Sequence, residues 1–370
     1  MQQTPGNTPL NKNIPYYPAL DGIRGLAIIL VILTHNFGYT TYFQFGWMGV
    51  DIFFTLSGFL ITQIIMKTVH EPGFLKKFYL RRMFRIAPVY YGTLVVCLIL
   101  LPLFPIKNAD LTYFTSNQVW IWIYAQNWLF IFKEPYGAKY LLHLWSLAVE
   151  EQFYLFWPLI VLLVRKPKKL FFIVLSLLVL TLIGRYFVWT SHIENLNYYH
   201  LYTFTRIDGI CIGCMLALLL EVNTALVRRY TLPVVLAFAA FNFVFYFINK
   251  SSFHSLPYLA ILGYTSFALL FGYLIYEASL NQKGILNILF NNRIMRFLGK
   301  ISYGLYVFHW PIHLFLFPVF EGILLNNLGL PLYLVPKLSS AITIIIAIIV
   351  SSLSYKYFEN YFLNLKKRYV

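Results

Sequence analysis

The first apolar run of the chain contains an arginine and a histidine whose spacing suits chemistry inside a membrane. Arg24 and His35 lie in LDGIRGLAIILVILTHN, residues 20–36. Their spacing of eleven positions, at about 100° each, puts both side chains on one helix face, with His35 about 16 Å further along the axis. Ionisable groups are costly in a hydrocarbon core about 30 Å thick, so both are functional candidates. The alternative is an arginine that reaches lipid headgroups and a histidine that only packs.

The second apolar run carries another costly group, Asp51, in GWMGVDIFFTLSGFLITQIIM. An aspartate in lipid requires a partner, and His35 at a similar depth is the one we expect. A carboxylate that accepts from one imidazole nitrogen leaves the other nitrogen free to act as a base. The competing interpretation is a structural hydrogen bond between two helices.

A basic segment before the third apolar run has closely spaced arginines, in KKFYLRRMFRIAPVYY. On a helix Arg82 and Arg85 share a face, and two guanidinium forks suit phosphate groups. A topology signal explains the same charge equally well, because basic residues gather on the cytoplasmic side of membrane proteins.

Carboxylates and a further arginine occur in two later apolar runs. Glu150 and Glu151 point about 100° apart and cannot face one neighbour. We expect one of them to face inward, pairing with Arg206 or binding a ligand hydroxyl, unless both lie in water at the interface. Arg206 and Asp208 in TRIDGICIG are candidates for substrate binding. Small residues that permit close helix packing follow them at Gly209, Gly213 and Ala217.

A polar stripe follows one face of GKISYGLYVFHWPI, near the end of the chain. Ser302, Tyr306, His309 and His313 are spaced at offsets of 0, 4, 7 and 11 on an otherwise apolar helix. Such a stripe either lines a cavity or makes hydrogen bonds between helices.

Composition indicates the fold that positions these groups. With 59% hydrophobic and 11% charged residues among 370, the chain is too apolar for a globular domain of that length. We expect an all-α polytopic protein of the cytoplasmic (inner) membrane, with about ten transmembrane helices and both termini in the cytoplasm. The net charge of +16 is concentrated in alternate loops, which indicates membrane orientation rather than nucleic-acid binding. No cleaved signal peptide, disulfide or metal site is expected.

The expected organisation is a flexible tail over 1–18, a single transmembrane domain over 19–358 and a basic tail over 359–370. Residues 107–142 are apolar over too short a stretch to span, so we interpret them as interfacial or re-entrant. The expected spans are 20–38, 45–66, 86–106, 143–164, 170–189, 204–221, 231–249, 256–278, 301–320 and 337–356.

Together these stretches resemble the membrane-bound acyltransferase-3 family, whose members move acyl groups from cytoplasmic acyl-CoA to extracytoplasmic acceptors. Each string is short, but six of them occur in the expected order. The matching elements are Arg-x10-His at 24–35, G-V-D-x-F-F-x-L-S-G-F at 49–59, R-x-x-R at 82–85, S-L-x-V-E-E-Q-F-Y at 146–154, R-x-D-G at 206–209 and S-Y-x-x-Y-x-x-H at 302–309.

The resemblance implies an O-acyltransferase that takes acyl-CoA, with acetyl-CoA expected, and acts on a hydroxyl of a surface polysaccharide or lipid-linked glycan. His35 would be the general base, oriented by Asp51, with Glu150 and His309 as further catalytic candidates. The implied contacts for the CoA phosphates are Arg24, Arg82 and Arg85. From the residues themselves we expect Arg206, Asp208, Ser302 and Tyr306 to contact the substrate.

The route of the acyl group is open at this point. In the direct route the pantetheine arm passes Arg24, and the thioester reaches the level of His35. In a two-step route the acyl group is first loaded onto His35 or onto a hydroxyl. The alternative function is a glycolipid or polysaccharide transporter that makes no bond, although we find no internal repeat of the kind common in transporters. Many members of the family also carry a hydrolase-like domain that handles the acceptor, so the acceptor is not specified here.

Overall fold

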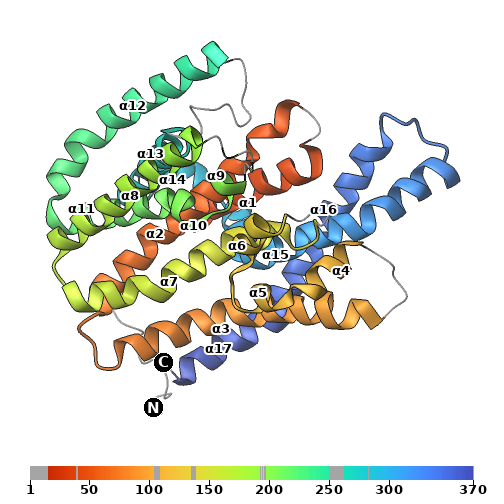
Figure 1. Cartoon of the computed structure of the whole chain (residues 1–370), viewed down its shortest axis with the longest axis horizontal. Coiled ribbons are helices and arrows are strands. Elements are labelled where there is room, and N and C mark those ends of the chain that lie inside the picture. The colour runs from red at the N-terminus through yellow and green to blue at the C-terminus, as the bar shows by residue number, and fades with distance from the viewer. Residues whose placement is uncertain are drawn as a thin grey trace, which may run out of the picture.

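The computed structural model describes residues 16–38, 41–103, 109–134, 139–191, 193, 195, 197–249, 262–281 and 283–369. All regular structure in these ranges is helical, which confirms the all-α prediction (Figure 1). The long helices are α1 Pro18–Phe37, α2 Met48–Thr68, α3 Phe74–Leu94, α7 Trp145–Val164, α8 Pro167–Thr190, α11 Asp208–Val222, α12 Thr224–Asn249, α13 Tyr264–Leu280, α15 Arg293–Gly322 and α16 Val335–Leu353. The short ones are α4 Ala109–Ser116, α5 Gln118–Trp122, α6 Gln126–Phe132, α9 Asn197–His200, α10 Thr203–Arg206, α14 Ile285–Phe290 and α17 Asn360–Tyr369.

Eight helical stretches within the described ranges are long and apolar enough to cross a membrane, so the polytopic prediction is confirmed. Two of the ten expected spans are shorter than this. The span expected at 204–221 is α11, of 15 residues, because the chain turns at Ile207 between α10 and α11. The span expected at 256–278 corresponds to α13, of 17 residues, and residues 256–261 of that prediction lie outside the described part.

The third span begins earlier than expected, at Phe74 rather than at residue 86. Gly73 precedes it with φ of +69°, a left-handed conformation that glycine adopts without steric cost. Arg82 and Arg85 therefore lie on α3 itself and not in a loop before it. The helix continues beyond Leu94 through a π-helical stretch, Val95–Leu100.

The segment expected to be interfacial or re-entrant forms the short helices α4, α5 and α6, none of which is long enough to span. Buried amides tie it to the rest of the protein. Gln126 donates to the carbonyl of Leu144 at 2.7 Å, and Asn127 donates to the carbonyl of Leu201 at 3.1 Å. Hydrogen bonding of this kind lets non-helical backbone exist within a membrane protein.

Glycines bring the helices that carry the candidate residues into close contact. A Cβ atom on Gly299 of α15 would lie 1.7 Å from the carbonyl oxygen of Asp21, so α1 and α15 touch through backbone. A Cβ atom on Gly213 of α11 would lie 2.1 Å from the carbonyl oxygen of Thr55 on α2. The predicted packing role of Gly213 is therefore confirmed, and α1 and α2 both have fixed neighbours.

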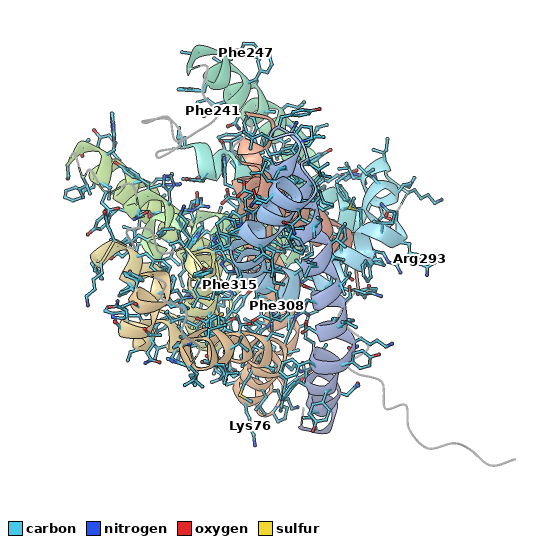
Figure 2. The ribbon with its side chains drawn as sticks, turned by 90° about the vertical axis from the view of Figure 1, so that its right-hand side faces the viewer. Lys76, Phe241, Phe247, Arg293, Phe308 and Phe315 are labelled. Atoms are coloured by element: carbon cyan, nitrogen blue, oxygen red, sulfur yellow. The ribbon has the colours of Figure 1, made fainter. Side chains whose placement is uncertain are left out.

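The two ends of the bundle expose different kinds of side chain, apolar on α12 and basic on α3. Helix α12 runs along one edge in Figure 1 and exposes apolar side chains such as Phe243 and Phe247, as expected for a lipid-facing helix. Figure 2 shows Phe247 at one extreme of the molecule and Lys76 of α3 at the other. The basic residues of α3 therefore mark the end opposite to the tip of α12.

The C-terminal part is helical rather than a tail. After α16 the chain forms a π-helical stretch, Ser354–Glu359, and then α17, which packs along α3 (Figure 1). The expected N-terminal tail lies outside the described residues except for its last three positions, and Pro18 already belongs to α1. Tyr17 and Leu363 line one cavity, so the start of α1 and helix α17 lie at the same end of the bundle.

Candidate active site

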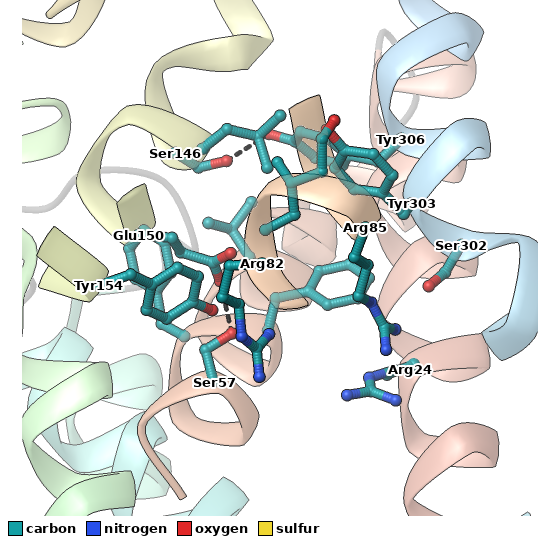
Figure 3. A pocket seen from close by; sticks show the side chains of 15 residues that line it. Arg24, Ser57, Arg82, Arg85, Ser146, Glu150, Tyr154, Ser302, Tyr303 and Tyr306 are labelled. Atoms are coloured by element: carbon teal, nitrogen blue, oxygen red, sulfur yellow. Dashed lines mark hydrogen bonds between the residues drawn. The ribbon is translucent and has the colours of Figure 1, made fainter. Parts of the chain in front are cut away.

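Two adjoining cavities enter the bundle at the end that carries the arginines. We name the larger one, of about 380 Å³, the outer cavity and the smaller one, of about 100 Å³, the inner cavity. Figure 3 shows the guanidinium groups of Arg24, Arg82 and Arg85 gathered on one side of the inner cavity, with Ser146 and Tyr306 at its other end. The residues that line both cavities are Arg24, Ser57, Arg82, Arg85, Tyr154 and Tyr303.

The three arginines come from α1 and α3, and within the described ranges only Arg24 forms an ion pair. Arg24 donates to Asp21 at 2.9 Å, and Asp21 also accepts from the Tyr16 hydroxyl at 2.7 Å, which raises the pKa of that phenol. Arg82 lies over the ring of Tyr154, 5.3 Å from its centroid. Neither Arg82 nor Arg85 has a hydrogen bond or ion pair with another residue in the described ranges, so both forks are available to an anion.

The far end of the inner cavity is closed by hydroxyl groups with assignable protons. The Tyr306 hydroxyl donates to the carbonyl oxygen of His143 at 2.5 Å. A phenol has a single proton, so the Ser146 hydroxyl must be the donor in its 2.6 Å hydrogen bond with Tyr306. The inner cavity therefore ends at Ser146 and Tyr306, and His35 does not line it.

A histidine pair lies immediately beyond this end. His35 Nδ1 is 2.7 Å from His309 Nε2, and His309 Nδ1 is 2.8 Å from the carbonyl oxygen of Tyr306. A carbonyl only accepts, so the hydrogen bonds assign the proton of His309 to Nδ1 and leave Nε2 as an acceptor. His35 then donates from Nδ1 and keeps a lone pair on Nε2. That arrangement suits a general base.

The expected pairing of Asp51 with His35 is wrong. Asp51 accepts from Arg206 at 2.7 Å, and both side chains are buried. Asp208 pairs in the same way with Arg185, at 2.9 Å. The reason is rotational: Asp51 faces Arg206 at the end of α10, just before α11, whereas His35 faces α15.

Arg206 and Asp208, our candidates for substrate binding, line neither cavity. The ring of Tyr264 lies 3.8 Å from the Arg206 guanidinium carbon and covers it. Desolvated, mutually paired charges of this kind join α2 to α10 and α8 to α11, as structural ion pairs do. Their substrate role remains a prediction.

Removing one member of this buried pair is expected to destabilise the protein strongly. Arg206→Met leaves Asp51 as an unpaired buried charge, which costs about 3–5 kcal/mol, and Asp51→Asn in the same chain should restore most of the loss. Thermal unfolding in detergent measures both effects. Arg228→Met, at an exposed site, is the control. A single Arg206 variant as stable as the wild type would contradict the structural role.

The two adjacent glutamates face different cavities, as their helical spacing predicted. Glu150 lines the inner cavity and accepts from Ser57 at 2.8 Å, so its expected pairing with Arg206 is wrong. Glu151 instead lines a separate cavity of about 390 Å³ between α3 and α7. One glutamate therefore faces inward, as expected, and the binding of a ligand hydroxyl by Glu150 stays a prediction.

The polar stripe of α15 serves both roles that its spacing allowed. Ser302 and Tyr306 line the inner cavity. His309 meets His35, and His313 meets the Asn36 side chain at 2.7 Å and Thr343 at 3.1 Å. The end of the stripe with Ser302 and Tyr306 therefore lines a cavity. The other end, at His313, makes hydrogen bonds that connect α15 to α1 and α16.

Sequence reasoning identified Glu150 but missed His143, Ser146 and Tyr154, which share a polar face with it at the start of α7 and in the turn just before it. His143, Ser146, Glu150 and Tyr154 are spaced at offsets of 0, 3, 7 and 11, nearly the pattern that identified the stripe on α15. The His143 ring lies 5.3 Å from that of His309 and 5.5 Å from that of Tyr306. The same periodicity, applied to this segment, would have found it. No group of metal-ligating side chains occurs in the ranges that the structure describes.

Comparisons with known proteins place the chain in a family. A family model described as "Acyltransferase domain", of the acyltransferase-3 type, matches residues 17–354. "Peptidoglycan O-acetyltransferase OatA" of Listeria monocytogenes is 33% identical over 83% of this chain and 51% of its own length. A "Putative peptidoglycan O-acetyltransferase" of Bacillus subtilis is 30% identical over 93% of this chain and 54% of its own length. A "Putative O-acetyltransferase" of Staphylococcus aureus strain COL is 29% identical over 98% of this chain and 59% of its own length.

The chain spans about half the length of the curated relatives it matches. No solved structure gives a significant match. The family match covers α1 to α16, with the three arginines, the residues that line the inner cavity and the histidine pair. The chain is therefore a member of the membrane-bound acyltransferase-3 family.

Proposed function

We propose that this protein transfers an acyl group, with acetyl expected, from acyl-CoA to a hydroxyl group of an extracytoplasmic glycan. The observation that carries the proposal is the sequence of groups along one path. Three arginines line the entrance, hydroxyl groups end the inner cavity, and an imidazole with a free lone pair lies just beyond. Relatives named as peptidoglycan O-acetyltransferases support a glycan acceptor.

The sizes of the cavities suit the two parts of the donor. The outer cavity, of about 380 Å³, falls in the range of small-molecule sites, about 300–1,000 Å³. In our proposal it takes the nucleotide end of CoA, with the phosphates on Arg24, Arg82 and Arg85. The inner cavity, of about 100 Å³, admits only a thin chain such as the pantetheine arm. The thioester would then reach the level of Ser146 and Tyr306.

The chemistry assigned to His35 follows from its hydrogen bond to His309. His35 Nε2 removes the proton of the acceptor hydroxyl while that oxygen attacks the thioester carbonyl. The carbon–sulfur bond breaks, and the sulfur leaves as CoA thiol after taking up the proton. The acceptor oxygen forms the new ester bond. General-base assistance of this kind is worth about 10²–10⁴-fold in rate.

Direct transfer requires the acceptor to meet the thioester across the layer formed by Tyr306, His143 and His309. The ring centroids of Tyr306 and His309 are 5.8 Å apart, and those of His309 and His35 are 5.0 Å apart. A two-step route through a hydroxyl or imidazole at this layer bridges the same gap. Both routes use the same donor path, and they differ in whether the protein itself carries the acyl group.

Purified protein in liposomes, given radiolabelled acetyl-CoA, tests the proposal. We expect CoA thiol to be released when a soluble peptidoglycan fragment is added, with the label recovered on the fragment. A transporter would release no thiol in response to the acceptor, and that outcome would contradict the proposal. Rapid quenching without acceptor separates the two routes, because only the two-step route leaves label on the protein.

A further inference from the structure

The C-terminal part of the chain, beyond the family match at residue 354, contributes a wall of the outer cavity. It begins with the π-helical stretch Ser354–Glu359 and continues as α17. Tyr355, Glu359 and Leu363 are four positions apart and all line the outer cavity. Local π-helical geometry is frequent at functional sites. None of these three residues belongs to the motifs that define the candidate active site.

Glu359 is the acidic group of this wall, and it is poorly satisfied by protein. Its side chain is 7% exposed, and the one hydrogen bond that it makes with a described residue is a long one, from the Ser354 hydroxyl at 3.4 Å. Among the residues with described positions it has no ion pair within 4.0 Å, although the arginines line the same cavity. Keeping a carboxylate away from water costs free energy unless it accepts hydrogen bonds or is paired with a positive charge.

The neighbouring helix leaves room for this carboxylate. A Cβ atom on Gly304 of α15 would lie 2.8 Å from Glu359 Oε1. Any larger residue at 304 would displace the carboxylate from its place in the wall. Because Gly304 has no side chain, the Glu359 carboxylate can occupy this position in the wall of the outer cavity, where acyl-CoA would meet it.

Building on the donor site proposed above, we infer that Glu359 recognises the nucleotide end of acyl-CoA by accepting hydrogen bonds from its ribose hydroxyl and adenine amino groups. An ionised carboxylate only accepts hydrogen bonds, and it repels phosphate. The outer cavity is lined by arginines and by two carboxylates, Asp21, which is paired with Arg24, and Glu359. It therefore favours a ligand with both phosphates and N–H or O–H donors. A nucleotide has both, whereas pyrophosphate has the phosphates but neither the ribose hydroxyls nor the adenine amino group.

Whether variants of Glu359 and Gly304 bind CoA more weakly or more tightly than the wild type tests this inference. Isothermal titration on the full chain in detergent compares CoA with pyrophosphate. We expect Glu359→Ala to weaken CoA binding by about 10–100-fold, the value of a hydrogen bond to a charged group, without weakening pyrophosphate binding. Gly304→Ala removes no charge but displaces the carboxylate, so it should weaken CoA binding in the same direction.

Two controls match these variants. Glu277→Gln removes a carboxylate that lines neither cavity, and Gly322→Ala adds a methyl group on α15 where nothing lies within 4 Å. If Glu359 acts only through its charge, Glu359→Gln will tighten the binding of both ligands, because an anion loses a repulsive neighbour. Tighter or unchanged CoA binding in the Glu359 variants overturns the inference. Failure of the wild type to bind CoA overturns the donor site itself.

Discussion

His35→Ala is expected to lower the rate of acyl transfer by about 10²–10⁴-fold, because the general base is lost. CoA affinity should not change, since His35 lines neither cavity. The variant should also remain folded, because His35 has a single hydrogen-bond partner in the described ranges, His309. Initial rates of CoA thiol release in the presence of acceptor measure the first effect, and titration with CoA measures the second.

His70→Ala is the matched control for this experiment, since His70 is exposed between α2 and α3, away from both cavities. It should leave both the rate and the affinity at the wild-type level. Near-normal transfer in His35→Ala would remove His35 from the mechanism. Loss of CoA binding in the same variant would instead mean that the donor extends beyond Tyr306.

The double variant Arg82→Ala, Arg85→Ala is expected to weaken CoA binding by at least about 10²-fold. A hydrogen bond to a charged group contributes about 1.5–3 kcal/mol, and two such contacts with phosphate are lost together. The remaining affinity should depend less on salt than that of the wild type, because fewer charge pairs are left to screen. Titration with CoA at two ionic strengths measures both quantities.

Arg81→Ala provides the control, because Arg81 has the same charge and is adjacent in the chain but lines neither cavity. Its removal should change CoA affinity little. A double lysine variant at 82 and 85 separates charge from geometry, since lysine keeps the charge but lacks the planar fork. An unchanged dissociation constant in the double alanine variant would disprove the phosphate assignment.

The spacing of residue types along the sequence predicted the fold class and which side chains share a helix face. The apolar runs predicted an all-α membrane protein, and in the part of the chain that the structure describes eight of them form helices long enough to span. The shared face of Arg24 and His35 and the divergence of Glu150 and Glu151 depend only on helix geometry, which is the same in any α-helix. Residues on one helix are related by the chain itself, so their spacing could be calculated from sequence alone.

Contacts between helices were decided only by the tertiary structure. Asp51 and His35 lie on neighbouring helices, yet each faces a different partner, Arg206 and His309. Which faces meet depends on how each helix is rotated, and close glycine contacts such as that of Gly213 with Thr55 set this rotation. Sequence spacing has no information on that angle.

The packing of helices also explains why the cavities could not be predicted from the sequence. Arg24 and the arginine pair of α3 are more than fifty residues apart, and only packing brings them to one entrance. Tyr306 ends the inner cavity because α15 lies against α1 and α7, which spacing within α15 could not indicate. The sequence by itself determined the fold class and the groups capable of chemistry. The packing of helices determined which of those groups meet, because helix rotation and close approach depend on contacts between residues far apart in the chain.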